Sequence, residues 1–236
     1  MAYGGNVALG FTQSLGWVVD NVSDSWNASI LVFTFTIGGL IGLWILSGGT
    51  HGFADLLGRR VKGARGAQLA SYVAGWFIFL DDYANSAAVG TTFRPLSDKY
   101  RVSKEKFSFI VDSTAAPICT IFLVSSWIGY EVGLIGDSLP EAAMMTPYMY
   151  FLYSIPYKFY SLMMLALVLI LVLWRRDYGP MLKAEHRART TGKLIRDGAK
   201  PLSGGEEFDV VEKVKYRASN MWIPLVILIG MTVFSK

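Results

Sequence analysis

The sequence predicts an all-α polytopic membrane protein in which transmembrane helices are accompanied by a re-entrant hairpin and a broken helix. Three observations predict this fold class. Of the 236 residues, 53% are hydrophobic and 17% are charged, which is typical of integral membrane proteins. Twenty of the 22 Lys and Arg residues fall in three stretches of the chain. Two adjacent carboxylates, Asp81 and Asp82, directly follow a long apolar run.

Apolar segments of sufficient length predict three transmembrane helices. At about 1.5 Å per residue, about 20 residues cross a hydrocarbon core of about 30 Å. We expect helices at about 28–47, 107–130 and 155–174, followed by a cytoplasmic loop at 175–220. A last apolar segment, 221–236, is the start of a truncated transmembrane helix, because it is too short to span. We therefore expect the sequence to be a fragment of a longer polypeptide.

The distribution of basic residues predicts that the stretches 59–65, 94–106 and 175–217 face the cytoplasm. Only one apolar stretch separates the first two, and a single crossing cannot return the chain to its own side. A re-entrant hairpin over about 64–93 resolves the conflict, because the chain then enters and leaves on the cytoplasmic side. In the alternative, 67–93 is an ordinary transmembrane helix and one basic stretch lies outside.

The expected hairpin tip carries the first group of candidate residues for ion binding and proton coupling. Carboxylates at bilayer depth are rare and usually line an ion or substrate path. On a helix, Asp82 shares a face with Asn85 and Ser86, whereas Asp81 is rotated by about 100°. We expect the chain to turn between Asp81 and Gly90, with a helix break at Gly90. One aspartate is expected to bind the ion and the other to act as a gate, cap or proton relay; the sequence leaves open which is which.

A second oxygen-rich group, Asp112, Ser113 and Thr114, lies just before Pro117. Proline has no backbone N–H, so the carbonyl of Ser113 loses its helical donor and a helix break is expected there. A free carbonyl beside a carboxylate and two hydroxyls forms the kind of shell that hard cations prefer. These residues are therefore the expected counterpart of the hairpin tip.

Simpler interpretations of several residues stay open. The aspartate pair could cap a helix or lie at an interface, and Pro117 could be a packing kink alone. Ser125 and Ser126 are expected to bond back to helix carbonyls rather than to bind ions. Lys158 lies in an aromatic segment and is expected to extend toward the membrane interface. A role as a counter-ion is the alternative for this lysine.

Other chemistries find little support in the sequence. The single cysteine, Cys119, excludes an internal disulfide, and the distant His51 and His186 have no metal-ligand spacing. No cofactor and no resident metal ion are therefore expected. The basic residues cluster between apolar segments, where membrane orientation explains them better than nucleic-acid binding does.

Two acidic motifs in a fixed order carry a family resemblance. The first is Leu80-Asp81-Asp82-Tyr83, with Asn85 and the stretch 89–95 (VGTTFRP) after it. The second is 112–117 (DSTAAP), preceded by Val102-Ser103 and followed at a distance by 179–185 (GPMLKAE). Together these motifs resemble the NhaC family of Na⁺/H⁺ antiporters.

The resemblance implies a multi-pass secondary transporter of the bacterial inner (plasma) membrane that exchanges Na⁺ for H⁺ and is not an enzyme. It also implies an ion-transporter-type fold completed by a missing remainder of the same polypeptide, and it leaves a homodimer open. The family includes exchangers of small organic acids of the malate and lactate type and of amino acids, so cation-coupled exchange of such a substrate is the alternative. A remote alternative, an intramembrane aspartyl protease, would need a Gly-x-Gly-Asp element that both acidic motifs lack.

The expected mechanism is competition between Na⁺ and H⁺ for one set of carboxylates. A carboxyl group of Asp has an ordinary pKa of about 3.9, and desolvation raises such a pKa toward the physiological range. A bound cation stabilises the ionised form and releases the proton. Exchange of the two ions follows if only occupied states reorient across the membrane.

Overall fold

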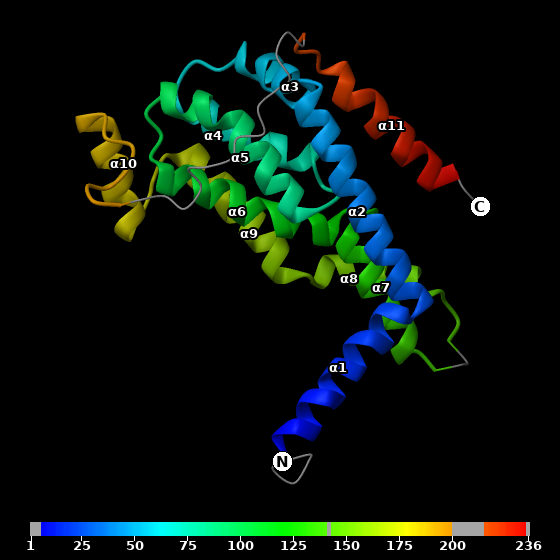
Figure 1. Cartoon of the computed structure of the whole chain (residues 1–236). Helices are drawn as coiled ribbons and strands as arrows, with labels where there is room; N and C mark the ends of the chain where they lie inside the picture. The colour runs from blue at the N-terminus through cyan, green and yellow to red at the C-terminus, as the bar shows by residue number, and fades with distance from the viewer. Residues whose placement is uncertain (1–5, 141–142, 200–214, 235–236) are drawn as a thin grey trace.

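The computed structural model describes residues 6–140, 143–199 and 215–234, and every regular element in these ranges is helical. Figure 1 shows the helices along the chain. They are α1 (Val7–Ser23), α2 (Ser25–Leu46), α3 (Gly49–Gly58), α4 (Ala64–Phe77), α5 (Asp82–Lys99), α6 (Lys104–Ile121), α7 (Ser126–Ser138), α8 (Pro147–Ser154), the 3₁₀ turn η1 (Ile155–Tyr157), α9 (Phe159–Trp174), α10 (Gly179–Thr191) and α11 (Ser219–Phe234). The all-helical class predicted from the sequence is confirmed for this part of the chain.

Two segments of the described chain are long and apolar enough to cross a membrane, namely Ser25–Leu46 and a window within Phe159–Thr191. Lys104–Ile121 and Ser126–Ser138 would form a third crossing if this pair, which is bent by 45°, is one span. These segments agree with a membrane protein. The N-terminal α1 was not anticipated, has no buried residue and extends away from the hairpin in Figure 1.

The segment with the paired aspartates forms an antiparallel pair of helices, α4 and α5. The hydroxyl of Tyr100, just after α5, donates to the carbonyl of Val61, just before α4, over 2.9 Å. The second helix therefore returns to the point where the first begins. The expected position of the turn was wrong. The chain turns at 78–81, and Gly90 lies inside α5, because the Asp81 side chain caps a new helix at once.

The expected break at Pro117 was also wrong, because α6 continues through this proline to Ile121. The interruption lies at 122–125 and is followed by α7. Proline removes one backbone donor, which a packed membrane helix tolerates. The new helix instead begins where Ser125 supplies an N-cap, accepting from the N–H of Ile128 over 3.3 Å.

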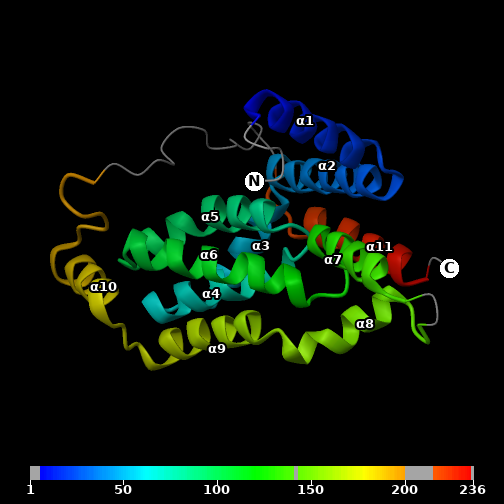
Figure 2. The ribbon, with the colours of Figure 1, turned by 90° about the horizontal axis from the view of Figure 1, so that it is seen from below.

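A third interruption lies at the start of the helix expected at 155–174, most of which is the single helix α9. The chain forms α8, then η1 with Pro156, and then α9, which starts after Lys158. The helices α4, α5, α6 and α9 lie side by side in Figure 2. Polar contacts join α9 to its neighbours: Thr120 and Ser161 hydroxyls are 2.8 Å apart, and the Tyr72 hydroxyl donates to the Leu165 carbonyl over 3.3 Å.

The segment expected to be a cytoplasmic loop contains α10, which docks on the start of α6. Glu185 is buried, and its carboxylate accepts from the N–H and the hydroxyl of Ser103, each over 2.8 Å. An anion at a helix N-terminus is favourable because the first N–H groups have no partner in the helix. Lys106 and Asp177 form a buried ion pair beside this contact.

The short α3 packs against α11 through glycines. A β carbon at Gly52 would lie 2.5 Å from the backbone nitrogen of Ala218, so only glycine allows this approach. Met221 of α11 is buried in the same region. The last helix thus begins by packing on a segment more than 160 positions earlier in the sequence.

We predict that Glu185→Ala loosens α10 from α6. Alanine keeps the helix propensity but leaves the N–H and hydroxyl of Ser103 without their charged acceptor, at a cost of about 1.5–3 kcal/mol. Limited trypsin digestion of the purified protein should then cut faster at Lys183 and Arg187. Asp197→Asn, which removes a partner of an exposed pair, is the control, and equal cleavage of the two variants would contradict the prediction.

Candidate functional site

Two of the chain interruptions meet in space. The N–H of Ser126, at the start of α7, donates to the carbonyl of Leu80 over 2.9 Å. The rings of Phe79 and Phe122 stack with their centroids 4.0 Å apart. The turn of the α4–α5 hairpin and the break between α6 and α7 therefore form one structural unit, which we call the double break (residues 78–81 and 122–125).

Asp81 lies at the centre of the double break and is only 8% exposed. One carboxylate oxygen accepts from the N–H of Ala84 over 3.0 Å, and the other accepts from the hydroxyl of Ser126 over 2.9 Å. Asp81 is thus the N-cap of α5, as the simpler interpretation allowed, and it also binds the second interruption. Both donors stabilise a negative charge at this position.

Asn85 is fully buried one turn further along α5. Its amide NH₂ donates to the carbonyls of Gly75 over 2.9 Å and Ile78 over 2.7 Å, at the end of α4. Its side-chain oxygen has no hydrogen-bond partner in the part of the chain that the structure describes. A buried acceptor without a partner is costly and calls for an explanation.

The hydroxyl oxygen of Thr114 faces the same place as the free oxygen of Asn85. A β carbon at Gly75 would lie 3.2 Å from the Thr114 hydroxyl oxygen and 3.7 Å from the Asn85 oxygen. Thr114 donates its proton to the carbonyl of Ile110 over 2.7 Å, so lone pairs of its oxygen remain. Glycine at position 75 therefore leaves room for two buried acceptor oxygens from α5 and α6.

The other predicted residues lie apart from this buried group. Asp112 and Ser86 line a cavity of about 370 Å³ between α5 and α6, together with Gly90, Thr91 and Arg94. Asp112 is exposed, whereas Asp82 and Ser113 are half-buried on α5 and α6. The structure thus brings Asp81, Asn85 and Thr114 close to the double break and Ser86 and Asp112 to the neighbouring cavity.

Ser125 and Ser126, after α6, were both expected to bond back to helix carbonyls, but only one of them does. Ser125 does bond back, donating to the carbonyl of Cys119 over 2.7 Å. Ser126 instead donates to Asp81. The signal that could have identified it was its place in a second interruption, because the ends of broken helices need partners from elsewhere in the protein.

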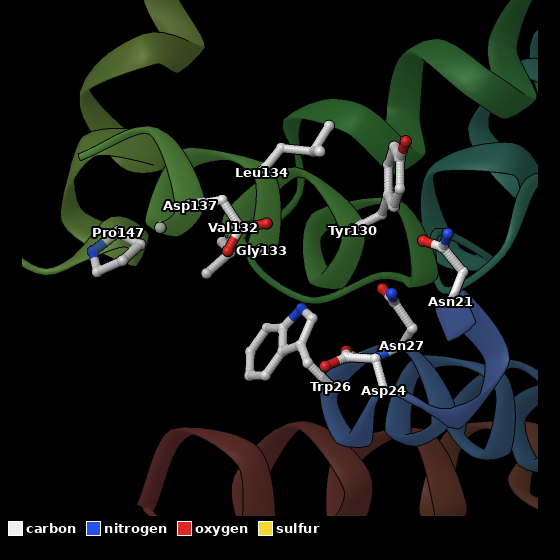
Figure 3. Close-up of a pocket in the computed structure, with 11 residues that line it drawn as sticks. Asn21, Asp24, Trp26, Asn27, Tyr130, Val132, Gly133, Leu134, Asp137 and Pro147 are labelled. Atoms are coloured by element: carbon white, nitrogen blue, oxygen red, sulfur yellow. The ribbon is translucent and has the colours of Figure 1, made fainter. Parts of the chain in front are cut away.

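A second groove, beside α7, is shown in Figure 3. It measures about 480 Å³ and lies between the α1–α2 junction and α7, with Asp24 and Asp137 among its lining residues. Asp24 caps α2 by accepting from the N–H of Asn27 over 2.9 Å. None of the predicted site residues lines this groove, so it adds nothing to the candidate site.

Comparison with known proteins identifies the family of this chain. The sequence pattern of the Na⁺/H⁺ antiporter family matches residues 118–236, which include α7, α8 and α9. The chain belongs to the Na⁺/H⁺ antiporter family. The matched family is one of transporters. The matched region contains Ser126 and Lys158, whereas Asp81 and Asn85 precede it.

A relative of this antiporter-family chain is an uncharacterised protein of Haemophilus influenzae. The two are 32% identical over 209 residues, which is 88% of this chain and 38% of the relative. The chain thus spans well under half the length of that protein. No solved structure matches the chain.

We predict that Asn85→Leu lowers the thermal stability of the protein. The substitution leaves the buried carbonyls of Gly75 and Ile78 without the amide donor, at about 1–3 kcal/mol for each unsatisfied group. Ser86→Ala, on the adjacent position of the same helix, is the control. Unfolding midpoints in detergent should separate the two variants, and a midpoint of Asn85→Leu that equals the control would show that the amide does not hold α4.

Proposed function

We propose that this protein exchanges Na⁺ for H⁺ across the bacterial inner membrane, as an antiporter of the NhaC type. The observation that carries the proposal is the double break, where two helix interruptions meet beside paired carboxylates and a buried oxygen of Asn85 without a partner. Interrupted helices at membrane depth are tolerated where they line a site or are buried in protein. Family membership supports cation and proton exchange in general.

The dimensions of the hairpin support a re-entrant arrangement. The 14 residues of α4 rise about 21 Å, less than the roughly 30 Å of a hydrocarbon core. Both helices have basic residues at the ends that lie together, near Val61 and Tyr100. With those ends at the cytoplasmic surface, the turn at 78–81 would lie within the bilayer.

We propose different roles for the two aspartates. Asp81 is already bound by Ala84 and Ser126, so it acts as a positioning residue that joins the two interruptions. Asp82 carries the exchanged proton and provides a charged ligand for Na⁺. It shares a helical face with Asn85, whose free oxygen, with that of Thr114, would add neutral ligands of the kind that hard cations prefer.

The cavity lined by Ser86 and Asp112 would serve as the cytoplasmic approach to this site. It lies beside the basic residues Arg94 and Lys104, near the hairpin ends assigned to the cytoplasm. A carboxylate in an access path raises the local cation concentration. Asp112 is therefore proposed to attract Na⁺ and to pass it to the more deeply buried oxygens.

The same cavity favours one second candidate function. Its volume of about 370 Å³ and the presence of Arg94 and Lys104 in its lining suit a small organic acid or amino acid better than a bare cation. In that case the protein would exchange such a substrate in a cation-coupled reaction. Dependence on an organic co-substrate distinguishes this candidate from simple antiport.

We predict that Asp82→Asn slows Na⁺-driven proton movement by the full-length protein in liposomes by at least about tenfold, as followed with an internal pH dye. Loss of a charged ligand is expected to cost about 1.5–3 kcal/mol, or roughly tenfold or more in rate. Asp137→Asn makes the same chemical change in the remote groove of Figure 3 and should leave exchange intact.

Exchange retained by Asp82→Asn would remove this aspartate from the site. Gly75→Ala offers an independent check, because its methyl group would occupy the space between the Thr114 and Asn85 oxygens and should weaken Na⁺ dependence. Proton movement that requires malate, lactate or an amino acid in the buffer would favour the second candidate.

A further inference from the structure

The third interruption places a lysine against the end of a broken helix. Lys158 lies between η1 and α9, and its side chain is 16% exposed. Its ammonium group donates to the carbonyl of Thr120, in the last turn of α6, over 2.9 Å. The lysine therefore points into the protein, and the expectation that it extends to the membrane interface was wrong.

This contact satisfies one of the last carbonyls of α6. The carbonyl of Ile118 accepts from the N–H of Phe122 over 3.1 Å, and the carbonyl of Cys119 accepts from the Ser125 hydroxyl over 2.7 Å. Lys158 satisfies the next carbonyl, that of Thr120. A cation is favourable at this position because the C-terminal end of a helix carries partial negative charge.

Two further groups hold the ammonium in place. It forms an ion pair with the carboxylate of Glu131 on α7 and lies 4.5 Å from the ring centroid of the buried Phe151. An ammonium and a carboxylate in apolar surroundings stabilise one another, since either alone would be costly there. Lys158 thus contacts α6, α7 and α8 at once, on both sides of the second interruption.

We propose that Lys158 is a positioning residue for cation exchange, a fixed charge that holds the end of α6 and the start of α7 in the geometry of the double break. Its effect reaches the site through a series of contacts: Thr120 is next to Cys119, whose carbonyl accepts from Ser125, and the following residue, Ser126, donates to Asp81. Asn85 performs the same task for α4 with a neutral amide. This inference rests on the proposed function and adds a residue outside the aspartate motifs.

The test compares Lys158→Met, Lys158→Arg, Glu131→Gln and the double variant Lys158→Met/Glu131→Gln in the full-length protein in liposomes. For Lys158→Met we expect the half-saturating Na⁺ concentration to rise roughly fivefold to tenfold, as suits a partly buried charge at a helix terminus. Lys158→Arg should restore most of the Na⁺ dependence because arginine can bind the same carbonyl and carboxylate. Lys193→Met, in an exposed ion pair, is the matched control and should behave as the wild type.

The double variant separates positioning from charge balance. In Lys158→Met the carboxylate of Glu131 has lost its partner, which should lower protein yield and stability. If Lys158 holds the end of α6, the double variant should recover yield and stability but should bind Na⁺ as weakly as Lys158→Met does. If the double variant regains the wild-type Na⁺ dependence, the lysine only neutralises Glu131 and the inference is overturned.

Cys119 provides a readout that does not depend on transport. This thiol is buried in the last turn of α6, and a maleimide should modify it faster in Lys158→Met than in Lys158→Arg, with any cysteine outside residues 1–236 replaced. Unchanged protection of Cys119 in Lys158→Met would overturn the inference. If the wild-type protein moves no protons on addition of Na⁺, the proposed function is wrong. The rate of Cys119 modification would still test whether Lys158 holds the end of α6.

Discussion

The structure depends on one constraint: every helix that stops inside the protein must have its terminal backbone groups bound by other parts of the chain. Four helix ends meet at the double break, and each has its partner. Asn85 binds the end of α4, Asp81 caps the start of α5, and Ser125 both binds the end of α6 and caps the start of α7. Lys158 binds a further carbonyl at the end of α6, that of Thr120. The turn of the hairpin and the bend of 45° between α6 and α7 lie where these partners meet.

The same requirement explains why polar chemistry gathers in the centre of an otherwise apolar protein. The groups that satisfy helix ends are carboxylates, amides, hydroxyls and an ammonium, so capping residues and candidate ion ligands are neighbours. Asn85 uses only its amide NH₂ in this role, and its side-chain oxygen has no hydrogen-bond partner among the described residues. A member of the Na⁺/H⁺ antiporter family thus obtains unused acceptor oxygens without placing further charges among its apolar helices.

The sequence predicted the helical class, the two acidic segments and a returning pair of helices around Asp81, because composition and charge distribution act over whole segments. The sequence did not predict where individual helices begin and end, or which distant residues two of the side chains contact. Asp81 was expected to begin a turn, yet its side chain begins a helix, and Pro117 was expected to break a helix that neighbouring helices keep intact. Lys158 and Ser126 were misjudged because their partners, Thr120 and Asp81, are 38 and 45 positions away. The assignment of Asp112 and Asp82 to ion binding stays a prediction.

Because α10 docks on its first turn, α6 is held by other parts of the chain at both of its ends. Its first turn is fastened by Glu185 and Asp177, and its last by Lys158 and Ser125. A helix held at both ends is expected to move as one rigid element, with little bending. A displacement of α6 is therefore expected to be accommodated at the residues that flank this helix. The segment after α9 that carries α10 would move with α6, so a displacement of α10 would be transmitted to Ser126 at the start of α7.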